Sequence, residues 1–216
     1  MKRTSFDHWK DNKYGNPDTH YTETKPESKY ERTRNLVRYI DATLSSGHSE
    51  TSPTRENYRV CEFGCNNGRN LTPLYCLGYD VYGLDISPEA ITSATSKMMP
   101  FNHPRSQFRV LDLYNDIHML DDMSDNYFDF SFTMGFLMHL PKGKQKTKLI
   151  DQIIRVSKNV VIYEPAGSHE ASEDDGWHLS LEDYGHYSRS LKRIGNVPHQ
   201  HPDNDYFGFW HLSKGD

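Results

Sequence analysis

The chain has 216 residues, a net charge of -5 and three cysteines. This length favours one domain with a single sizeable core, and the acidic balance argues against a protein that binds polyanions. The N-terminus carries no signal-peptide core, and no apolar run reaches the ~20 residues of a membrane span. Cys61, Cys65 and Cys76 match no common zinc spacing, so we expect small buried residues in a reducing, cytoplasmic environment.

Residues 1–28 are polar, and we treat them as an aromatic-rich N-terminal segment that precedes a single domain at residues 29–216. The isolated aromatic side chains of this segment include Trp9, Tyr14 and Tyr21. The domain opens with apolar residues at helical spacing from Lys29 to Ser45. This spacing predicts a helix with one face packed inward.

Strands and helices then alternate, which is the pattern of a parallel sheet with crossover helices. The predicted strands are Arg59–Phe63, Asp80–Asp85, Phe108–Leu113, Phe128–Thr133 and Asn159–Tyr163. Helices are predicted at about Arg69–Leu77, after the cap Ser87-Pro88-Glu89, and around Leu149–Ile154. The rest of the chain predicts a short helix near Ser180–Tyr184 and a terminal hairpin of Leu191–Val197 and Tyr206–Leu212.

The first two predicted strands each end in an acid, and a small-residue turn lies between them. Glu62 and Asp85 are the two acids, and Gly64 and Gly68 lie in the turn. Glycine lets the backbone approach a ligand without a Cβ atom in the way. A carboxylate at the end of the second strand can accept from both hydroxyls of a ribose. The order predicts a nucleotide-type cofactor site, and the alternative is an ordinary strand-to-helix turn.

The spacing of the turn excludes two common phosphate loops. A dinucleotide fingerprint that starts at Gly64 would need glycine at the positions of Asn66 and Arg69. A P-loop would need Gly-Lys-Ser/Thr, which does not follow. What remains is acid-x-Gly-x-small-x-Gly, from Glu62 to Gly68, with Asn66 at a position where a positive φ is tolerated.

This motif resembles the first motif of the class I S-adenosylmethionine-dependent methyltransferases, in which glycine usually stands at the position of Asn66. More narrowly, the chain is similar to methyltransferases associated with pseudaminic acid and related surface-sugar gene clusters. The similarity includes the turn Glu62–Gly68, the stretch Phe128–Pro141 and the last strand, within His201–Leu212. It covers nearly the whole chain and implies a Rossmann-like α/β fold. The implied sheet has seven strands, mostly parallel, with a C-terminal antiparallel hairpin.

The resemblance implies S-adenosyl-L-methionine as cofactor and assigns residues to its methionine and ribose. Glu62 would act on the methionine ammonium, or else be a structural acid that caps the turn. Asp85 would hold the ribose hydroxyls. Backbone contacts to the methionine part and ribose would come from Gly64, Cys65, Asn66 and Gly68.

The adenine and sulfonium ends have their own implied residues. Ile86 would pack on one adenine face, and Asp112 would accept from the adenine amino group, with Leu113 contributing backbone. Asp112 is alternatively a plain strand-end acid. Thr133 and Met134 would lie beside the sulfonium, although Met134 is equally a core residue. Trp9, Tyr14 and Tyr21 would form a lid over the cofactor, or else pack onto the core.

The implied reaction is an in-line displacement at a methyl carbon, in which orientation supplies most of the catalysis. A general base is needed only for a protonated acceptor. His139 is the candidate base, because a neutral imidazole accepts a proton near pH 7. Its alternative is a packing or capping histidine. Glu164 would bind an acceptor amine or hydroxyl. His178, Tyr184 and His186 lie in the variable region where such folds shape substrate pockets, and we expect them on the surface and not in the site.

Two further readings receive less support. His199, His201 and His211 suggest a metal, but no carboxylate pair accompanies them, so we expect none. The run Lys142–Lys148 is interpreted as the solvated start of a helix and not as a nucleic-acid contact.

The sequence therefore favours methyl transfer to a small molecule, with a sugar or sugar-nucleotide suggested by the resemblance. The alternatives are a nucleic-acid methyltransferase and a protein that binds S-adenosylmethionine without turnover. The nucleic-acid alternative is weakened because the sequence lacks the Asp/Asn-Pro-Pro-aromatic signature and the Pro-Cys pair of DNA methyltransferases. The oligomeric state stays open.

Overall fold

The computed structural model of the protein describes residues 26–45, 54–99, 106–141, 143–166, 192–198 and 206–214. Several residues singled out in the sequence lie outside this part: Trp9, Tyr14, Tyr21, His178, Tyr184, His186, His199 and His201. The helix expected near Ser180–Tyr184 also lies outside it. Within the described residues, no helix combines the length and the apolar character that a membrane crossing requires.

The regular elements follow the predicted order. The strands are β1 Arg59–Phe63, β2 Asp80–Asp85, β3 Ser106–Val110, β4 Phe128–Met134, β5 Ser157–Ala166, β6 Lys192–Pro198 and β7 Tyr206–Ser213. The helices are α3 Pro26–Ser45, α4 Leu71–Cys76, α5 Pro88–Met98 and α6 Lys144–Arg155, with short 3-10 helices η1 Arg55–Asn57, η3 Ile117–Leu120 and η4 Leu137–His139.

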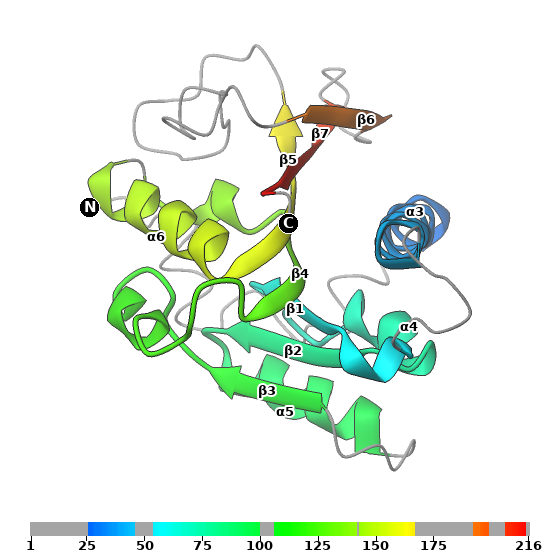
Figure 1. Cartoon of the computed structure of the whole chain (residues 1–216), viewed down its shortest axis with the longest axis horizontal. Helices are drawn as coiled ribbons and strands as arrows, with labels where there is room; N and C mark the ends of the chain where they lie inside the picture. The colour runs from blue at the N-terminus through cyan, green and yellow to red at the C-terminus, as the bar shows by residue number, and fades with distance from the viewer. Residues whose placement is uncertain are drawn as a thin grey trace.

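The strands of the described residues form one seven-stranded sheet in the order β3-β2-β1-β4-β5-β7-β6 (Figure 1). Strands β1 to β5 pair in parallel, and β7 runs antiparallel between β5 and β6. The predicted Rossmann-like class, with its C-terminal antiparallel hairpin, is confirmed. The order reverses between β1 and β4, and open α/β sheets bind ligands beyond the carboxyl ends of the strands at such a point.

Helices cover both faces of the sheet. Helices α3, α4 and α5 pack on one face, and α6 with η3 and η4 packs on the other (Figure 1). Because side chains alternate along a strand, β5 supplies both cores. Val160 and Ile162 join the core beneath α6, and Val161 joins the core beneath α3. The two cores hold the carboxyl ends of the strands in fixed positions.

Helix α3 is fastened to the sheet by apolar and polar contacts. The side chains of Leu36 and Ile40 are buried against the sheet. The Tyr79 hydroxyl donates to Asp41 Oδ1 at 2.7 Å, and Arg55 donates to both oxygens of the Asp41 carboxylate at 2.9 and 3.2 Å. Helix α3 is therefore an integral part of the fold.

His211 on β7 also packs against α3 and uses both ring nitrogens there. The Tyr39 hydroxyl lies 2.8 Å from Nδ1, and Nε2 lies 3.2 Å from Asn159 Oδ1. Since the Asn159 amide nitrogen donates to Asp129 O, its oxygen faces the ring and accepts from Nε2–H. Burial, with a smaller effect of Lys192, lowers the pKa of His211. Among the described residues, no group of three His, Cys, Asp or Glu is placed to hold a metal ion.

Two expectations about exposure are corrected. Cys61 and Cys65 are buried thiols, but Cys76 is exposed because the preceding residues of α4 take the inward positions. In the lysine run that begins α6, Lys146 is buried and not solvated. Its ammonium donates to the Leu140 carbonyl at 3.3 Å, which gives the buried charge an acceptor.

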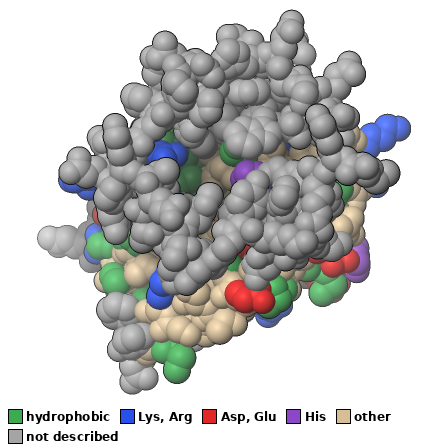
Figure 2. All heavy atoms as spheres, turned by 180° about the vertical axis from the view of Figure 1, so that it is seen from behind, with side chains coloured by type: hydrophobic (Ala, Val, Ile, Leu, Met, Phe, Trp, Pro, Cys, Tyr) green, Lys and Arg blue, Asp and Glu red, His purple; other side chains and the backbone are tan. Residues whose placement is uncertain are grey.

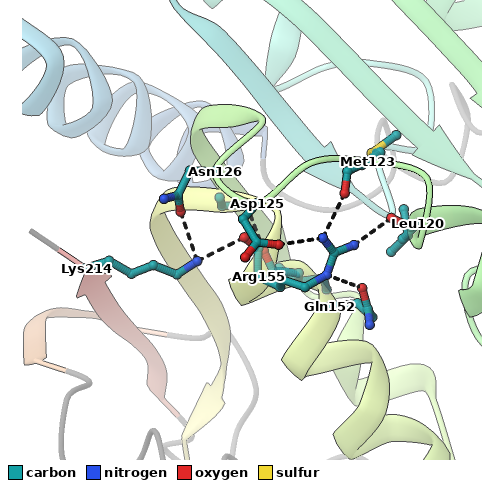
Figure 3. A network of polar contacts seen from close by, with 9 residues as sticks. Leu120, Met123, Asp125, Asn126, Gln152, Arg155 and Lys214 are labelled. Carbon is teal, nitrogen blue, oxygen red and sulfur yellow. Dashed lines mark hydrogen bonds and ion pairs between the residues drawn. The ribbon is translucent and has the colours of Figure 1, made fainter. Parts of the chain in front are cut away.

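Arg155, the last residue of α6, ties three segments together (Figure 3). Its guanidinium donates to the carbonyls of Leu120 and Met123, each at 2.7 Å, and to the Asp125 carboxylate at 2.8 Å. The ammonium of Lys214, which follows β7, donates to the Arg155 carbonyl at 3.0 Å. Arg155 thus fastens the loop before β4 to the end of α6.

Replacing this arginine should destabilise the protein. Arg155→Met leaves two backbone carbonyls without their donor, and we expect the free energy of unfolding to fall by about 2 kcal/mol. The matched control is Lys158→Met, which removes only a surface ion pair with Asp129 and should cost less than about 1 kcal/mol. Urea denaturation of both variants checks this. If both variants lose the same small amount of unfolding free energy, the assigned role of Arg155 is contradicted.

Candidate functional site

The turn between β1 and α4 has the backbone that a close ligand approach requires. Gly64, Asn66 and Gly68 have φ of 76°, 47° and 71°. Asn66 thus adopts the left-handed conformation that its side chain tolerates. A Cβ atom on Gly64 would lie 2.5 Å from the Phe136 ring, and one on Gly68 would lie 3.1 Å from Ala94 Cβ. Gly64 is therefore required by packing as well as by conformation, and Gly68 is favoured mainly by its conformation.

Glu62 lies in β1 immediately before this turn and is 1% exposed. The Asn70 side-chain amide donates to Oε1 at 2.6 Å. The other oxygen, Oε2, is buried and has no hydrogen-bond partner within the described part of the chain. Burial raises the pKa of Glu62 to about 8, although Asn70 and the charge of Arg69 pull it down. A cation at Oε2 would compensate both the unpaired oxygen and the cost of ionisation.

Asp85 ends β2 and reaches across to the same turn. Its Oδ2 accepts from the Asn66 backbone N–H at 2.7 Å, and its Oδ1 accepts from the Ser87 N–H at 3.0 Å. Burial raises the pKa of Asp85, while these backbone donors lower it. Each carboxylate oxygen has a second lone pair, so the group can also accept from ligand hydroxyls. Asp85 therefore fixes the turn and presents acceptors beside it.

The residues after β2 and β3 lie along the same edge of the sheet. Ile86 is half-buried next to Asp85. Strand β3 ends at Val110, so Asp112 lies in a turn and not within a strand. Its Oδ1 accepts from the N–H groups of Tyr114 and Asn115 at 3.2 and 3.1 Å, which stops the strand early.

Leu113 follows in the same turn. Its side chain is buried in the core beneath α6, and its N–H donates to the Leu111 carbonyl at 3.1 Å. The carbonyl of Asp85 in turn accepts from Leu111 N–H at 2.8 Å, so the turn after β3 is tied to the end of β2.

Glu164 near the end of β5 is a fully buried carboxylate with three backbone donors. Oε1 accepts from the N–H groups of Phe136 and Leu137, each at 3.0 Å, and Oε2 accepts from Met138 N–H at 3.2 Å. Burial raises the pKa of Glu164, and the backbone donors and Thr133 lower it. This geometry favours holding the loop after β4 in place over the expected direct contact with an acceptor.

The end of β4 and the loop after it supply the remaining candidates. Thr133 is fully buried, and Met134 is half-buried beside the core beneath α3. His139 is half-buried at the end of η4, the helix whose first N–H groups Glu164 binds. Cys65 is buried in the turn itself. The structure thus brings the described candidates from β1, β2, β4 and β5 to the carboxyl ends of these strands.

Sequence reasoning missed three residues of this region. Phe136 packs on Gly64, Asn70 donates to Glu62, and Thr33 of α3 donates to Asn70. Only Asn70 carried a signal, because it lies two residues after Gly68 at the start of a helix. Thr33 is distant in sequence, and nothing in its surroundings points to the turn.

The site's own geometry fits S-adenosylmethionine. Glu62 offers a buried carboxyl oxygen without a partner among the described residues to an ammonium, and Asp85 offers acceptors to a ribose, beside a turn that contains two glycines. A phosphate cofactor would fit poorly, because two carboxylates would repel it.

The comparisons agree with this geometry. Residues 61–161 match the family described as methyltransferase domain. Among curated proteins, none matches the sequence. Magnesium protoporphyrin IX methyltransferase from Synechocystis, solved with bound S-adenosylhomocysteine, is 14% identical with a TM-score of 0.68, and 97% of each chain is covered.

Two other solved structures have the same fold. The N-methyltransferase NodS from Bradyrhizobium japonicum, in complex with S-adenosylhomocysteine, is 17% identical with a TM-score of 0.67, covering 99% of this chain and 100% of that one. The bifunctional kinase-methyltransferase WbdD is 15% identical with a TM-score of 0.63 over 93% of this chain. This chain spans only 42% of that WbdD chain. Residues 61–161 are therefore similar to a methyltransferase domain, and the chain has the fold of these methyltransferase structures.

Proposed function

We propose that the protein transfers the methyl group of S-adenosylmethionine to a small molecule, and more narrowly to a sugar or sugar-nucleotide intermediate. The observation that carries the proposal is the pair of carboxylates, buried Glu62 and half-buried Asp85, that lie beside the Gly64–Gly68 turn. Magnesium protoporphyrin IX methyltransferase, by its name, acts on a small molecule, and this supports the small-molecule class. The sugar rests on the resemblance of the turn and of Phe128–Pro141 to the pseudaminic-acid-associated branch.

In this proposal the cofactor lies along the carboxyl ends of the strands. Glu62 Oε2 binds the methionine ammonium, and Asp85 accepts from the ribose hydroxyls. Ile86 and the turn at Asp112 and Leu113 border the adenine.

The other contacts lie nearer the reacting methyl group. The backbone of Gly64, Cys65, Asn66 and Gly68 lies against the methionine and ribose. Thr133 and Met134 border the sulfonium. Trp9, Tyr14 and Tyr21, outside the described residues, are proposed to cover the cofactor.

The protein's part in the chemistry is orientation. When bound, S-adenosylmethionine supplies a methyl group already activated by the sulfonium. The chain holds the acceptor in line with that methyl group, and alignment of this kind is worth up to ~7–11 kcal/mol. Glu164 fixes the loop that carries Phe136 and His139 through three backbone hydrogen bonds. His139 is proposed to accept the proton of a hydroxyl or ammonium acceptor.

A nucleic-acid substrate has less support. On the face shown in Figure 2, the described Lys and Arg side chains are scattered and gather into no continuous basic band. The buried Lys146 removes one charge from the only lysine run of the sequence. Phosphate contacts dominate the affinity of nucleic-acid-binding proteins, so a basic surface would be expected.

Release of S-adenosylhomocysteine tests the proposed function. The purified protein would be incubated with S-adenosylmethionine and panels of sugar nucleotides, small acids and nucleic acids. We expect turnover on the sugar-nucleotide panel. Tight cofactor binding with no turnover on any panel would favour the alternative of a binding protein without catalysis. Turnover on nucleic acid alone would overturn the small-molecule class.

Two variants separate cofactor binding from catalysis in this assay. Asp85→Ala removes the proposed ribose acceptor and the hydrogen bond that Asn66 N–H of the turn donates to it, so calorimetry should show a strong loss of affinity for S-adenosylhomocysteine. His139→Gln should keep that affinity and lower turnover about 10²-fold or more. Unchanged turnover in His139→Gln would exclude the histidine as base, and unchanged affinity in Asp85→Ala would exclude the ribose contact.

The buried carboxylate also predicts a pH dependence. The pKa of Glu62 is raised to about 8 in the folded protein, against about 4.3 in an unfolded chain. Between these values the unfolded chain releases the proton and the folded protein keeps it. The stability from the neutral carboxyl is therefore complete below about pH 4.3 and is lost as the pH rises through about 8.

Glu62→Gln removes this titration. The cofactor-free wild type should lose stability relative to the variant as the pH rises from about 5 to about 8, by a few kcal/mol. Urea denaturation of both proteins across this range checks it. A stability difference that stays constant with pH would contradict a buried neutral carboxyl at Glu62.

A further inference from the structure

Three buried side chains linked by hydrogen bonds connect helix α3 to Glu62, which lies just before the Gly64–Gly68 turn. Thr33 Oγ1 of α3 donates to Asn70 Oδ1 at 2.6 Å, and Asn70 Nδ2 donates to Glu62 Oε1 at 2.6 Å. Thr33, Asn70 and Glu62 are 6%, 5% and 1% exposed. Thr33 lies 37 residues before Asn70 and outside the region matched by the methyltransferase family, residues 61–161. The link is therefore a tertiary contact and not part of the turn.

The direction of these hydrogen bonds fixes the Asn70 amide. Its oxygen accepts from the Thr33 hydroxyl, so its nitrogen must face Glu62. A carboxylate can only accept when ionised, so the amide nitrogen is the group that suits it. The bond occupies Oε1 and leaves Oε2 as the oxygen without a partner among the described residues. Thr33 thereby holds the Asn70 amide in the orientation that donates to Oε1.

The same bond changes the protonation of Glu62. Burial raises the pKa of this carboxyl, and the Asn70 amide lowers it. The charge of Arg69 also lowers the pKa, and that of Asp85 raises it. An ammonium binds the ionised carboxylate better than the neutral acid, so support for the ionised form strengthens binding near neutral pH.

We propose that Thr33 and Asn70 are positioning residues that hold Glu62 for the methionine ammonium, which makes helix α3 part of the cofactor site. This inference rests on the proposed role of Glu62. It follows that cofactor binding and the docking of α3 favour each other, because linkage is reciprocal.

Five variants test the inference by calorimetry with S-adenosylhomocysteine at about pH 6.5 and about pH 8.5. Thr33→Val is nearly isosteric and removes only the hydroxyl, and Asn70→Leu removes the amide. Both should raise the Kd about tenfold at the lower pH and less at the higher pH, since the unsupported carboxylate ionises later. Thr33→Ser keeps the hydroxyl and should restore the wild-type affinity.

The matched control is Thr43→Val on the same helix. The Thr43 hydroxyl donates to the Tyr39 carbonyl one turn earlier in α3 and does not join the chain to Asn70. This variant should bind as the wild type does at both pH values. Hydrogen exchange gives a second readout, because saturation with S-adenosylhomocysteine should slow exchange of the α3 amides in the wild type and less so in Thr33→Val.

The outcomes separate this inference from the assignment beneath it. Wild-type affinity in Thr33→Val and Asn70→Leu, or a loss that is equal at both pH values, would overturn the positioning role. Glu62→Gln is measured alongside them. If Glu62→Gln itself binds like the wild type, the assignment of the ammonium site fails instead. If Asn70→Leu does not fold, Thr33→Val decides alone.

Discussion

Glu62 places a carboxylate in the interior at the carboxyl end of β1, where its ionisation is costly without a compensating partner. The fold supplies part of that compensation through Asn70 and Arg69 and leaves Oε2 without a partner in the described residues. In the proposed function, the ammonium group of the cofactor supplies the missing partner. The unfavourable burial of Glu62 would then contribute to the binding energy of a cationic ligand.

Two more carboxylates, of which Asp85 is half-buried and Glu164 is fully buried, organise the same edge of the sheet. Asp85 fastens the Gly64–Gly68 turn to the end of β2, and Glu164 fastens the loop after β4 to the end of β5. Each one binds backbone N–H groups, so each positions a segment and not a single side chain. The strand order reverses between β1 and β4, and these segments lie at the carboxyl ends of the strands beside that point. The sheet topology and the three carboxylates therefore define the site together.

Much of this arrangement was predictable from local sequence. Strands β1 and β2 have the predicted bounds, Ser87 caps α5 as predicted, and Asn66 adopts the positive φ that its residue type allows. Each of these features depends on residues within a few positions of one another. The pattern of apolar residues along the strands and the residue types in the turns and caps are sufficient to predict them.

What was not predictable depends on contacts between distant segments. The bond from Thr33 to Asn70 and the packing of Phe136 on Gly64 need the folded sheet before the residues meet. The role of Glu164 is of the same kind, since its three donors lie more than twenty residues earlier in the chain. In the sequence, an acid near the end of a strand looks the same whether its carboxylate binds a ligand or the backbone of a loop.

A crystal structure of the protein with S-adenosylhomocysteine would show directly whether Glu62 binds the ammonium group. We expect the ligand's ammonium within hydrogen-bond distance of Glu62 Oε2 and both ribose hydroxyls facing Asp85. We also expect Asn70 still to donate to Oε1. A ligand bound elsewhere, or one whose ammonium points away from Glu62, would contradict the proposed site.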